Sequence, residues 1–217
     1  ALNSIPDIIV SDIMMPVMNG ITMCKILKED VRTSHIPIIL LTAKDSLQDK
    51  EEGYQVGADS YLTKPFSATL LHSRINNLLE SRKRLTERFN TSTPHHNMDE
   101  KRALLAESLN KLDNEFIEKI NQLIEARLSS EKIDIGYLAD NMCMSKSTLY
   151  RKMKALTGLS TNEYVRKIKM QHAERLLLEG RYNISEVAFR VGINSVVYFR
   201  QCFKEEFGVL PSEYLKQ

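Results

Sequence analysis

The sequence predicts two structural parts: an α/β doubly wound parallel sheet, followed by an all-α region with two helix-turn-helix units. The first prediction rests on short apolar runs that alternate with helical patterns, and the second on an internal repeat near the C-terminus. The net charge is −2 over residues 1–78, zero over residues 79–128 and +4 over residues 129–217, where 14 Lys and Arg stand against 10 Asp and Glu. An acidic first part and a basic last part predict different partners for each.

The composition is that of a soluble, folded protein. Of the 217 residues, 42% are hydrophobic and 27% are charged, which suffices for packed cores and is atypical of a disordered chain. The longest apolar runs, such as residues 38–41, are far shorter than the ~20 residues that cross a bilayer, and no signal segment opens the sequence. Three widely spaced cysteines predict neither a disulfide framework nor a zinc module. We expect a cytoplasmic location, with inner-membrane tethering of a longer parent protein left open.

Short apolar runs in the first part predict buried parallel strands at residues 8–10, 36–41 and 60–62. Residues 20–31 have the length and amphipathic pattern of a helix, and residues 47–56 predict a second helix that a glycine closes. Strands that alternate with helices imply right-handed crossovers and one parallel sheet. Functional residues of such sheets gather beyond the carboxyl ends of the strands.

Three polar residues stand at those predicted strand ends: Asp12, Thr42 and Lys64. An aspartate at such an edge can accept a phosphoryl group as an acyl phosphate. Lys64 can neutralise the transferred oxygens, and Thr42 can donate a hydrogen bond to one of them. Any one of the three alone would be better explained as part of a structural ion pair. Together they favour a phosphoryl-accepting site.

Three motifs in this part resemble the receiver domain of bacterial response regulators. The motifs are Pro6–Pro16 with Asn19-Gly20, Leu41-Thr42-Ala43, and Tyr61–Phe66. The resemblance implies that Asp12 is the phosphoacceptor and that Lys64 contacts the phosphoryl group. It also implies that Thr42 and Tyr61 form the switch pair and that the peptide bond before Pro65 is cis.

The resemblance also implies a magnesium ion. The sequence, however, matches the family pattern only after the pattern's first elements. Receivers of this kind begin with a strand that ends in paired acidic residues, which hold Mg²⁺, and continue with a helix and a second strand. This sequence begins after all of these, so the matched ligands that remain are Asp12 and the backbone carbonyl of Met14. We therefore expect residues 1–80 to be a partial receiver that lacks the first strands. Either a longer parent protein or another chain would supply them, and the intact motifs favour the longer parent.

Residues 81–111 are predicted to form a helical and flexible linker between the two parts. The segment 90–97 is polar and contains a proline, which is typical of a boundary. The pair His95-His96 lacks neighbouring ligands at metal-binding spacing, so we assign no metal there. Beyond the linker, apolar residues recur on one helical face and predict a helix that packs into the next domain. These residues are Leu112, Phe116, Ile120, Leu123, Ile124 and Leu128.

The last part contains an internal repeat. Leu138-Ala139, Leu149, Met153, Gly158 and Tyr164 return as Val187-Ala188, Phe199, Phe203, Gly208 and Tyr214. The offset is 49 at the alanines and 50 at the glycines and tyrosines, so one extra residue lies in the second turn region. We predict helix-turn-helix units at residues 134–157 and 184–206. Ser145 and Ser195 are suitable N-caps for their second helices.

The second helix of each unit separates an apolar face from a polar face. Apolar residues at helical spacing, such as Leu149 and Phe199, would be core, which leaves basic and hydrogen-bonding residues outside. Such a face suits a major groove, although solvated surface is the plainer explanation and phosphate contact is favoured for the lysines. The candidate DNA-binding residues are Ser147, Tyr150, Arg151 and Lys154 in the first helix and Val196, Val197, Arg200, Gln201 and Lys204 in the second.

Residues 112–217 resemble the DNA-binding domain of AraC/XylS-type transcription regulators. The resemblance is carried by Val191-Gly192-Ile193, Tyr198-Phe199, Cys202-Phe203-Lys204, Phe207-Gly208, Pro211 and Tyr214. It implies that two recognition helices enter successive major grooves of double-stranded DNA, joined by a helix over residues 163–178. Ile193 replaces the Phe that is more usual in the family pattern. Val196 and Val197 are less polar than typical base-reading positions.

The two resemblances together imply a DNA-binding transcription regulator of a two-component phosphorelay, controlled by phosphorylation of Asp12. The implied partners are double-stranded DNA and a histidine kinase, in the same polypeptide or separate. Repositioning of Tyr61 would favour a homodimer, and RNA polymerase is a further candidate partner.

Two other interpretations stay open. In the first, the receiver part is only a dimerisation platform and DNA binding is constitutive. In the second, the protein is a phosphohydrolase that forms a phosphoaspartate at Asp12. The second is weaker, because such enzymes have Asp-x-Asp and this sequence has Met14 at the second position. We therefore predict no enzymatic activity.

Overall fold

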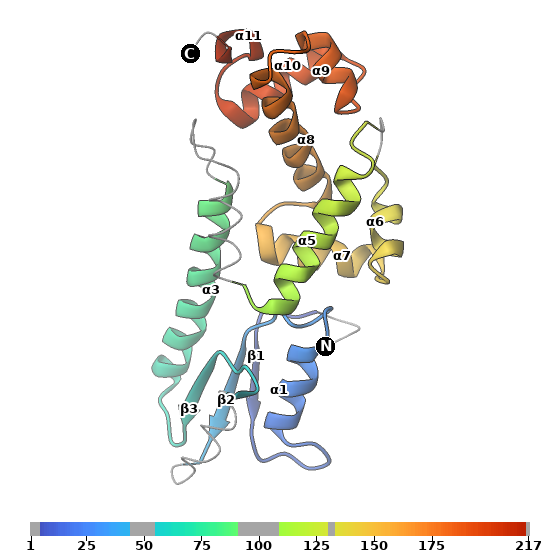
Figure 1. The fold of residues 1–217 in the computed structure, drawn as a ribbon. Helices are drawn as coiled ribbons and strands as arrows, with labels where there is room; N and C mark the ends of the chain where they lie inside the picture. The colour runs from blue at the N-terminus through green and yellow to red at the C-terminus, as the bar shows by residue number, and fades with distance from the viewer. Residues whose placement is uncertain (1–4, 44–54, 91–108, 130–132, 216–217) are drawn as a thin grey trace. The chain divides into compact units, whose positions relative to one another are not determined.

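The computed structural model describes residues 5–43, 55–90, 109–129 and 133–215 (Figure 1). The chain divides into two compact units. The first comprises residues 1–88 together with Asn110–Asp113, and the second comprises residues 89–109 and 114–217.

A three-stranded parallel sheet forms the centre of the first unit (Figure 1). Strands β1 (Ile9–Asp12), β2 (Ile38–Thr42) and β3 (Ser60–Thr63) lie in the order β1-β2-β3, and all pair in parallel. Ile9 pairs with Ile38 in register. The predicted strands are thus confirmed, with shifts of one or two residues at their ends. The predicted helix 47–56 falls almost wholly outside the described residues.

Helix α1 (Gly20–Glu29) covers one face of this sheet. The side chain of Asn19 caps it by accepting a hydrogen bond from the Thr22 amide at 2.7 Å, which satisfies one of the free amides of the first turn. Burial of the apolar face of α1 against the sheet supplies the core. The buried cluster consists of Ile13, Ile21, Cys24, Ile38, Leu40, Ala58 and Tyr61.

Gly20 lets α1 begin directly against the end of β1. A Cβ at this position would lie 2.3 Å from the backbone oxygen of Asp12, so the backbone itself would have to move. We expect Gly20→Ala to lower the free energy of unfolding of the first unit by about 1–3 kcal/mol, the usual range for overpacking. Lys25→Ala, on the exposed side of the same helix, should change it by less than about 0.5 kcal/mol. Equal thermal transitions for both variants, measured by calorimetry, would contradict this prediction.

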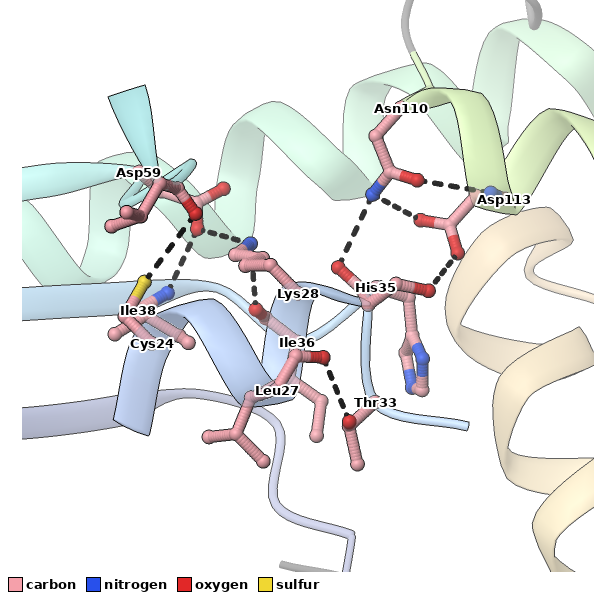
Figure 2. Close-up of polar contacts among 12 residues, drawn as sticks. Cys24, Leu27, Lys28, Thr33, His35, Ile36, Ile38, Asp59, Asn110 and Asp113 are labelled. Carbon is pink, nitrogen blue, oxygen red and sulfur yellow. Dashed lines mark hydrogen bonds and ion pairs between the residues drawn. The ribbon is translucent and has the colours of Figure 1, made fainter. Parts of the chain in front are cut away.

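A polar network around Asp59 holds the opposite end of the sheet together (Figure 2). The Asp59 carboxylate accepts hydrogen bonds from Lys28 Nζ at 2.7 Å and from the Ile38 amide at 2.9 Å. Lys28 Nζ also donates to the Ile36 carbonyl at 3.0 Å. Asp59 therefore joins the start of β3 to α1 and to the start of β2. Arg82 adds a third connection, since its guanidinium lies 3.9 Å from Asp59 and donates to the carbonyl of His35.

Arg82 belongs to helix α3 (Ala68–Asn90), which runs through the predicted domain boundary at residue 80 without interruption. Residues Asn110–Asp113, at the start of helix α5 (Lys111–Glu125), also belong to the first unit. There Ser34 Oγ donates to Asp113 Oδ1 at 2.7 Å, and Asn110 Nδ2 donates to the Ser34 carbonyl at 3.2 Å. Figure 2 shows these contacts at the buried turn that precedes β2.

The second unit consists of the rest of α5 and six further helices among the described residues (Figure 1). These are α6 (Ile135–Asn141), α7 (Lys146–Thr157), α8 (Thr161–Leu178), α9 (Ile184–Arg190), α10 (Val196–Phe207) and α11 (Pro211–Tyr214). Phe116, Ile120 and Ile124 of α5 are buried, as their helical spacing predicts. The Tyr164 hydroxyl of α8 donates to Asn121 of α5 at 2.9 Å, so a buried polar pair accompanies the apolar packing.

The internal repeat is visible in the backbone hydrogen bonds of the two turns. The amides of Met142, Cys143 and Met144 donate to the carbonyls of Leu138, Asp140 and Ala139. The amides of Val191, Gly192 and Ile193 donate to those of Val187, Phe189 and Ala188, each 49 positions later. The offset becomes 50 at the N-caps Ser145 and Ser195, so the predicted extra residue is Asn194. Cys143 and Gly192 both have positive φ, at 52° and 66°, which explains the glycine in the second turn.

Candidate functional site

The structure brings Asp12 and Lys64 into direct contact at the carboxyl edge of the sheet. Asp12 ends β1, and Lys64 follows β3, so the parallel order of the strands carries both side chains to the same edge. Lys64 Nζ forms an ion pair with Asp12 Oδ2, and the side chains are 44% and 34% exposed respectively. The Lys64-Pro65 peptide bond is cis, as the receiver resemblance implies.

This contact keeps the Asp12 carboxylate ionised and reachable from solvent. The hydrogen bond from Lys64 lowers the pKa of the Asp12 carboxyl, burial opposes it, and a hydrogen bond from the backbone amide of Met14 lowers it further. The Met14 amide lies 3.3 Å from Asp12 Oδ1. An ionised, accessible carboxylate can attack an electrophilic phosphorus, and a neighbouring primary ammonium can stabilise the acyl phosphate that forms.

The predicted switch residues lie close by, with their side chains turned inward. Thr42 ends β2 and is 1% exposed, and its hydroxyl donates to the Ala43 carbonyl at 3.1 Å. Tyr61 of β3 is buried in the cluster beneath α1. Only Asp12 and Lys64 of the four predicted residues therefore form the accessible part of the site.

The described residues alone do not fit a magnesium site. Mg²⁺ requires near-octahedral oxygen ligation. Asp12 would supply one carboxylate and the backbone carbonyl of Met14 one further oxygen, which together are too few. No cluster of three or more His, Cys, Asp or Glu that could hold a metal occurs among the residues that the structure describes.

The second site is formed by α7 and α10, the second helices of the two helix-turn-helix units. Each begins at a serine cap: Ser145 Oγ accepts from the Thr148 amide at 3.1 Å, and Ser195 Oγ accepts from the Tyr198 amide at 3.2 Å. Both N-caps are thus confirmed. Both helices end at a left-handed glycine, with φ of 73° in the first and 80° in the second.

Eight of the nine candidate DNA-binding residues are exposed on these helices, and the ninth is half-buried. The exposed residues are Ser147, Tyr150, Arg151, Lys154, Val197, Arg200, Gln201 and Lys204, and the half-buried residue is Val196. Leu149 and Met153 of α7 and Phe199 and Phe203 of α10 are buried, as the sequence pattern predicts. The two helices therefore present polar and basic faces to solvent.

Three lysines of the second unit lie in its interior instead of on this surface. Lys152 is 0% exposed and lies 4.9 Å from the ring centre of Phe116, whereas Lys167 and Lys169 are each 5% exposed. All three contribute to the net charge of +4 over residues 129–217. The spacing of Lys152 among the core positions Leu149, Met153 and Leu156 was the one signal that could have separated it from Arg151 and Lys154.

The fold combines a parallel sheet that carries an accessible aspartate–lysine pair at its carboxyl edge with a pair of helix-turn-helix units. Residues 2–76 match the family model of the response regulator receiver domain, and residues 138–217 match a helix-turn-helix domain family. The chain thus joins a response regulator receiver domain to an AraC-type helix-turn-helix domain.

Several known proteins are similar to the chain over one or both domains. Histidine kinase P4 of Formosa agariphila is 36% identical over 214 residues, which cover 99% of this chain and 15% of that protein. The DNA-binding dual master transcriptional regulator RpaA of Synechocystis is 43% identical over 82 residues, which cover 38% of this chain and 34% of that protein. The chain thus spans only a minor part of these curated relatives.

Among solved structures, the C-terminal domain of AraT, a response regulator from Geobacillus stearothermophilus, is 31% identical with a TM-score of 0.43. The match covers 46% of this chain and 84% of that one. Within the described part of the chain, no helix has both the length and the apolar character needed to cross a membrane.

Proposed function

We propose that this chain is the DNA-binding output end of a two-component regulator and that phosphorylation of Asp12 controls it. The observation that carries the proposal is the pair of serine-capped helices, α7 and α10, whose exposed faces hold arginine, lysine and hydrogen-bonding side chains. The similarity of the receiver part to DNA-binding regulators such as RpaA supports the same function.

The exposed residues suit recognition of double-stranded DNA. Arginine can bind guanine through two hydrogen bonds, glutamine can bind adenine in the same way, and valine can contact a thymine methyl group. We assign base reading to Arg151, Arg200 and Gln201, and phosphate contact to Lys154 and Lys204. The 18 residues of α8 span about 27 Å, which is comparable with the roughly 34 Å between successive major grooves.

In the proposed switch, one carboxylate oxygen of Asp12 attacks the phosphorus of a phosphoryl donor. A new oxygen–phosphorus bond forms, the bond to the donor group breaks, and the donor leaves with its electron pair. The Lys64 ammonium, which pairs with the carboxylate before the transfer, then neutralises the phosphoryl oxygens. The Thr42 hydroxyl must leave the Ala43 carbonyl in order to donate to the phosphoryl group, and we infer that Tyr61 moves with it.

The proposed partners follow from the two domains. A histidine kinase would phosphorylate Asp12, and the match of nearly the whole chain to part of histidine kinase P4 supports a kinase in the same polypeptide. We further propose a homodimer on repeated DNA half-sites, RNA polymerase as a downstream partner, a cytoplasmic location, and Mg²⁺ at a receiver completed by upstream strands. With methionine at position 14 in place of a carboxylic acid, we propose a regulator without hydrolase activity.

We expect Arg151→Ala to weaken binding to a specific duplex by about 1–3 kcal/mol and to relax the preference at one base pair. The duplex is selected from random-sequence DNA against the wild-type chain, and binding is measured by fluorescence anisotropy at several salt concentrations. Lys154→Ala on the same helix should instead weaken binding to all sequences and reduce the salt slope by about one. Selection that enriches no sequence would reject the proposed function.

A further inference from the structure

Three cationic side chains on one stretch of α8 contact the second helix-turn-helix unit. Lys167 Nζ lies 3.0 Å from Glu206 Oε1, and Arg166 Nη1 lies 3.5 Å from Glu205 Oε2, both in the last turn of α10. Lys169 Nζ donates to the carbonyl of Gly192, in the turn before α10, at 3.2 Å. We call Arg166, Lys167 and Lys169, together with these acceptors, the α8 clamp.

The clamp engages both ends of the second recognition helix. Gly192 precedes the N-cap of α10, whereas Glu205 and Glu206 lie in its last turn, so the contacts are separated by the 12 residues of the helix, or about 18 Å. Contacts at two well-separated points constrain both the angle of a helix and its rotation about its axis. A single contact would leave either the angle or the rotation unconstrained.

The main ion pair of the clamp is largely removed from water. The side chains of Lys167 and Glu206 are 5% and 18% exposed, so salt screens their attraction much less than that of a surface pair. Buried pairs of this kind contribute little net stability, but loss of one partner leaves an uncompensated charge. The pair is therefore better suited to fixing an arrangement than to holding the fold together.

The clamp also reaches a predicted base-reading residue. Glu205 accepts a hydrogen bond from Gln201 Nε2 at 3.1 Å and pairs with Arg166. A chain of contacts thus runs from α8 through Glu205 to Gln201 on the exposed face.

We propose that Arg166, Lys167 and Lys169 are positioning residues, which set the orientation in which α10 presents Arg200 and Gln201 to DNA. This inference rests on the proposed DNA-binding function and deepens it. The composition alone favours another role for these residues, namely phosphate contact by a basic helix. The two roles differ in the sign of one measurable effect.

That effect is the response of DNA affinity to Glu206→Gln. The substitution removes a negative charge, so if electrostatic attraction alone mattered, binding to DNA would become tighter. If Glu206 acts through Lys167 to orient α10, binding to the selected duplex weakens. We expect a loss of about tenfold, together with loss of hydroxyl-radical protection over one half-site only. Lys167→Met should behave alike, and the double variant should lose little more than either single variant.

The test uses the full 217-residue chain and a duplex selected from random-sequence DNA against the wild type. Glu179→Gln is the matched control, because it removes an exposed negative charge at the end of the same helix α8. It should bind as tightly as the wild type or more tightly. Failure of the wild type to enrich any duplex would reject DNA binding itself and is distinct from failure of the clamp.

Two outcomes would overturn the clamp. One is Glu206→Gln binding at least as tightly as the wild type, and the other is a salt slope reduced by about one in Lys167→Met, which indicates phosphate contact. If Glu206→Gln lowers the helix content in circular dichroism, the Arg166→Met variant tests the proposal instead. The Arg166 side chain is 43% exposed, so its replacement is tolerated by the fold. That variant should relax the preference at one base pair of the half-site of the second unit, and an unchanged preference would reject the proposal.

Discussion

Phe203→Ala is expected to lower the free energy of unfolding of the second unit by about 3–5 kcal/mol, the usual range for a fully buried phenylalanine. The Phe203 side chain is 0% exposed. Its ring centre lies 5.9 Å from that of Phe199, 4.5 Å from that of Phe207 and 5.6 Å from that of Tyr214. Truncation removes the common member of all three aromatic contacts and leaves a cavity between α10 and α11. Because such a loss is a large fraction of the stability of a small domain, specific DNA binding should fall with it.

Urea denaturation followed by circular dichroism measures this change, and Val197→Ala provides the control. Val197 is on the same helix and is 77% exposed, so its truncation should cost less than about 0.5 kcal/mol. A loss in Phe203→Ala no larger than in Val197→Ala would show that the aromatic cluster is not the core of the second unit.

Asp12→Asn is expected to abolish phosphoryl transfer to the receiver. The amide is nearly the same size as the carboxylate but lacks an anionic, nucleophilic oxygen, and it cannot form an ion pair with the Lys64 ammonium. The protein for this experiment is the chain extended upstream through the first receiver strands, because the described residues supply too few magnesium ligands. The intact mass after incubation with acetyl phosphate and Mg²⁺ reports the gain of one phosphoryl group.

Thr42→Ala separates phosphorylation from its consequence. It retains Asp12 and Lys64, so the extended chain should still gain the phosphoryl group, while the resulting change in DNA affinity should diminish. Equal mass gain in Asp12→Asn and the wild type would exclude Asp12 as the acceptor. Absence of mass gain in the extended wild type would instead favour the interpretation of the receiver as a dimerisation platform.

Short-range features of this protein could be predicted from its sequence because their causes are local. The strands end near Asp12, Thr42 and Lys64 because apolar runs stop there, and parallel strands bring their carboxyl ends to one edge. The repeated turns follow from spacing as well, since the hydrogen bonds that define them join residues three to five positions apart. The presence of one extra residue in the second turn region could also be predicted, from the change in the offset from 49 to 50.

Long-range polar contacts could not be predicted in this way. Asp59 bonds Lys28, 31 residues earlier, and Lys169 bonds the carbonyl of Gly192, 23 residues later, and neither pairing leaves a periodic signal. Nor does the pattern of residue types specify a side-chain rotamer, so the hydrogen bond from the Thr42 hydroxyl to the Ala43 carbonyl could not be predicted either.

The sequence by itself determined the order of the two domains, the identities of Asp12 and Lys64 at the sheet edge, and the two capped recognition helices. All of these depend on local spacing and on the direction of parallel strands. Only the tertiary structure decided which cations face solvent: Arg151 is exposed, whereas Lys167 is enclosed beside Glu206. The physical reason is that a long cationic side chain is placed by the elements that pack around it, and helical periodicity specifies a face without specifying what covers it.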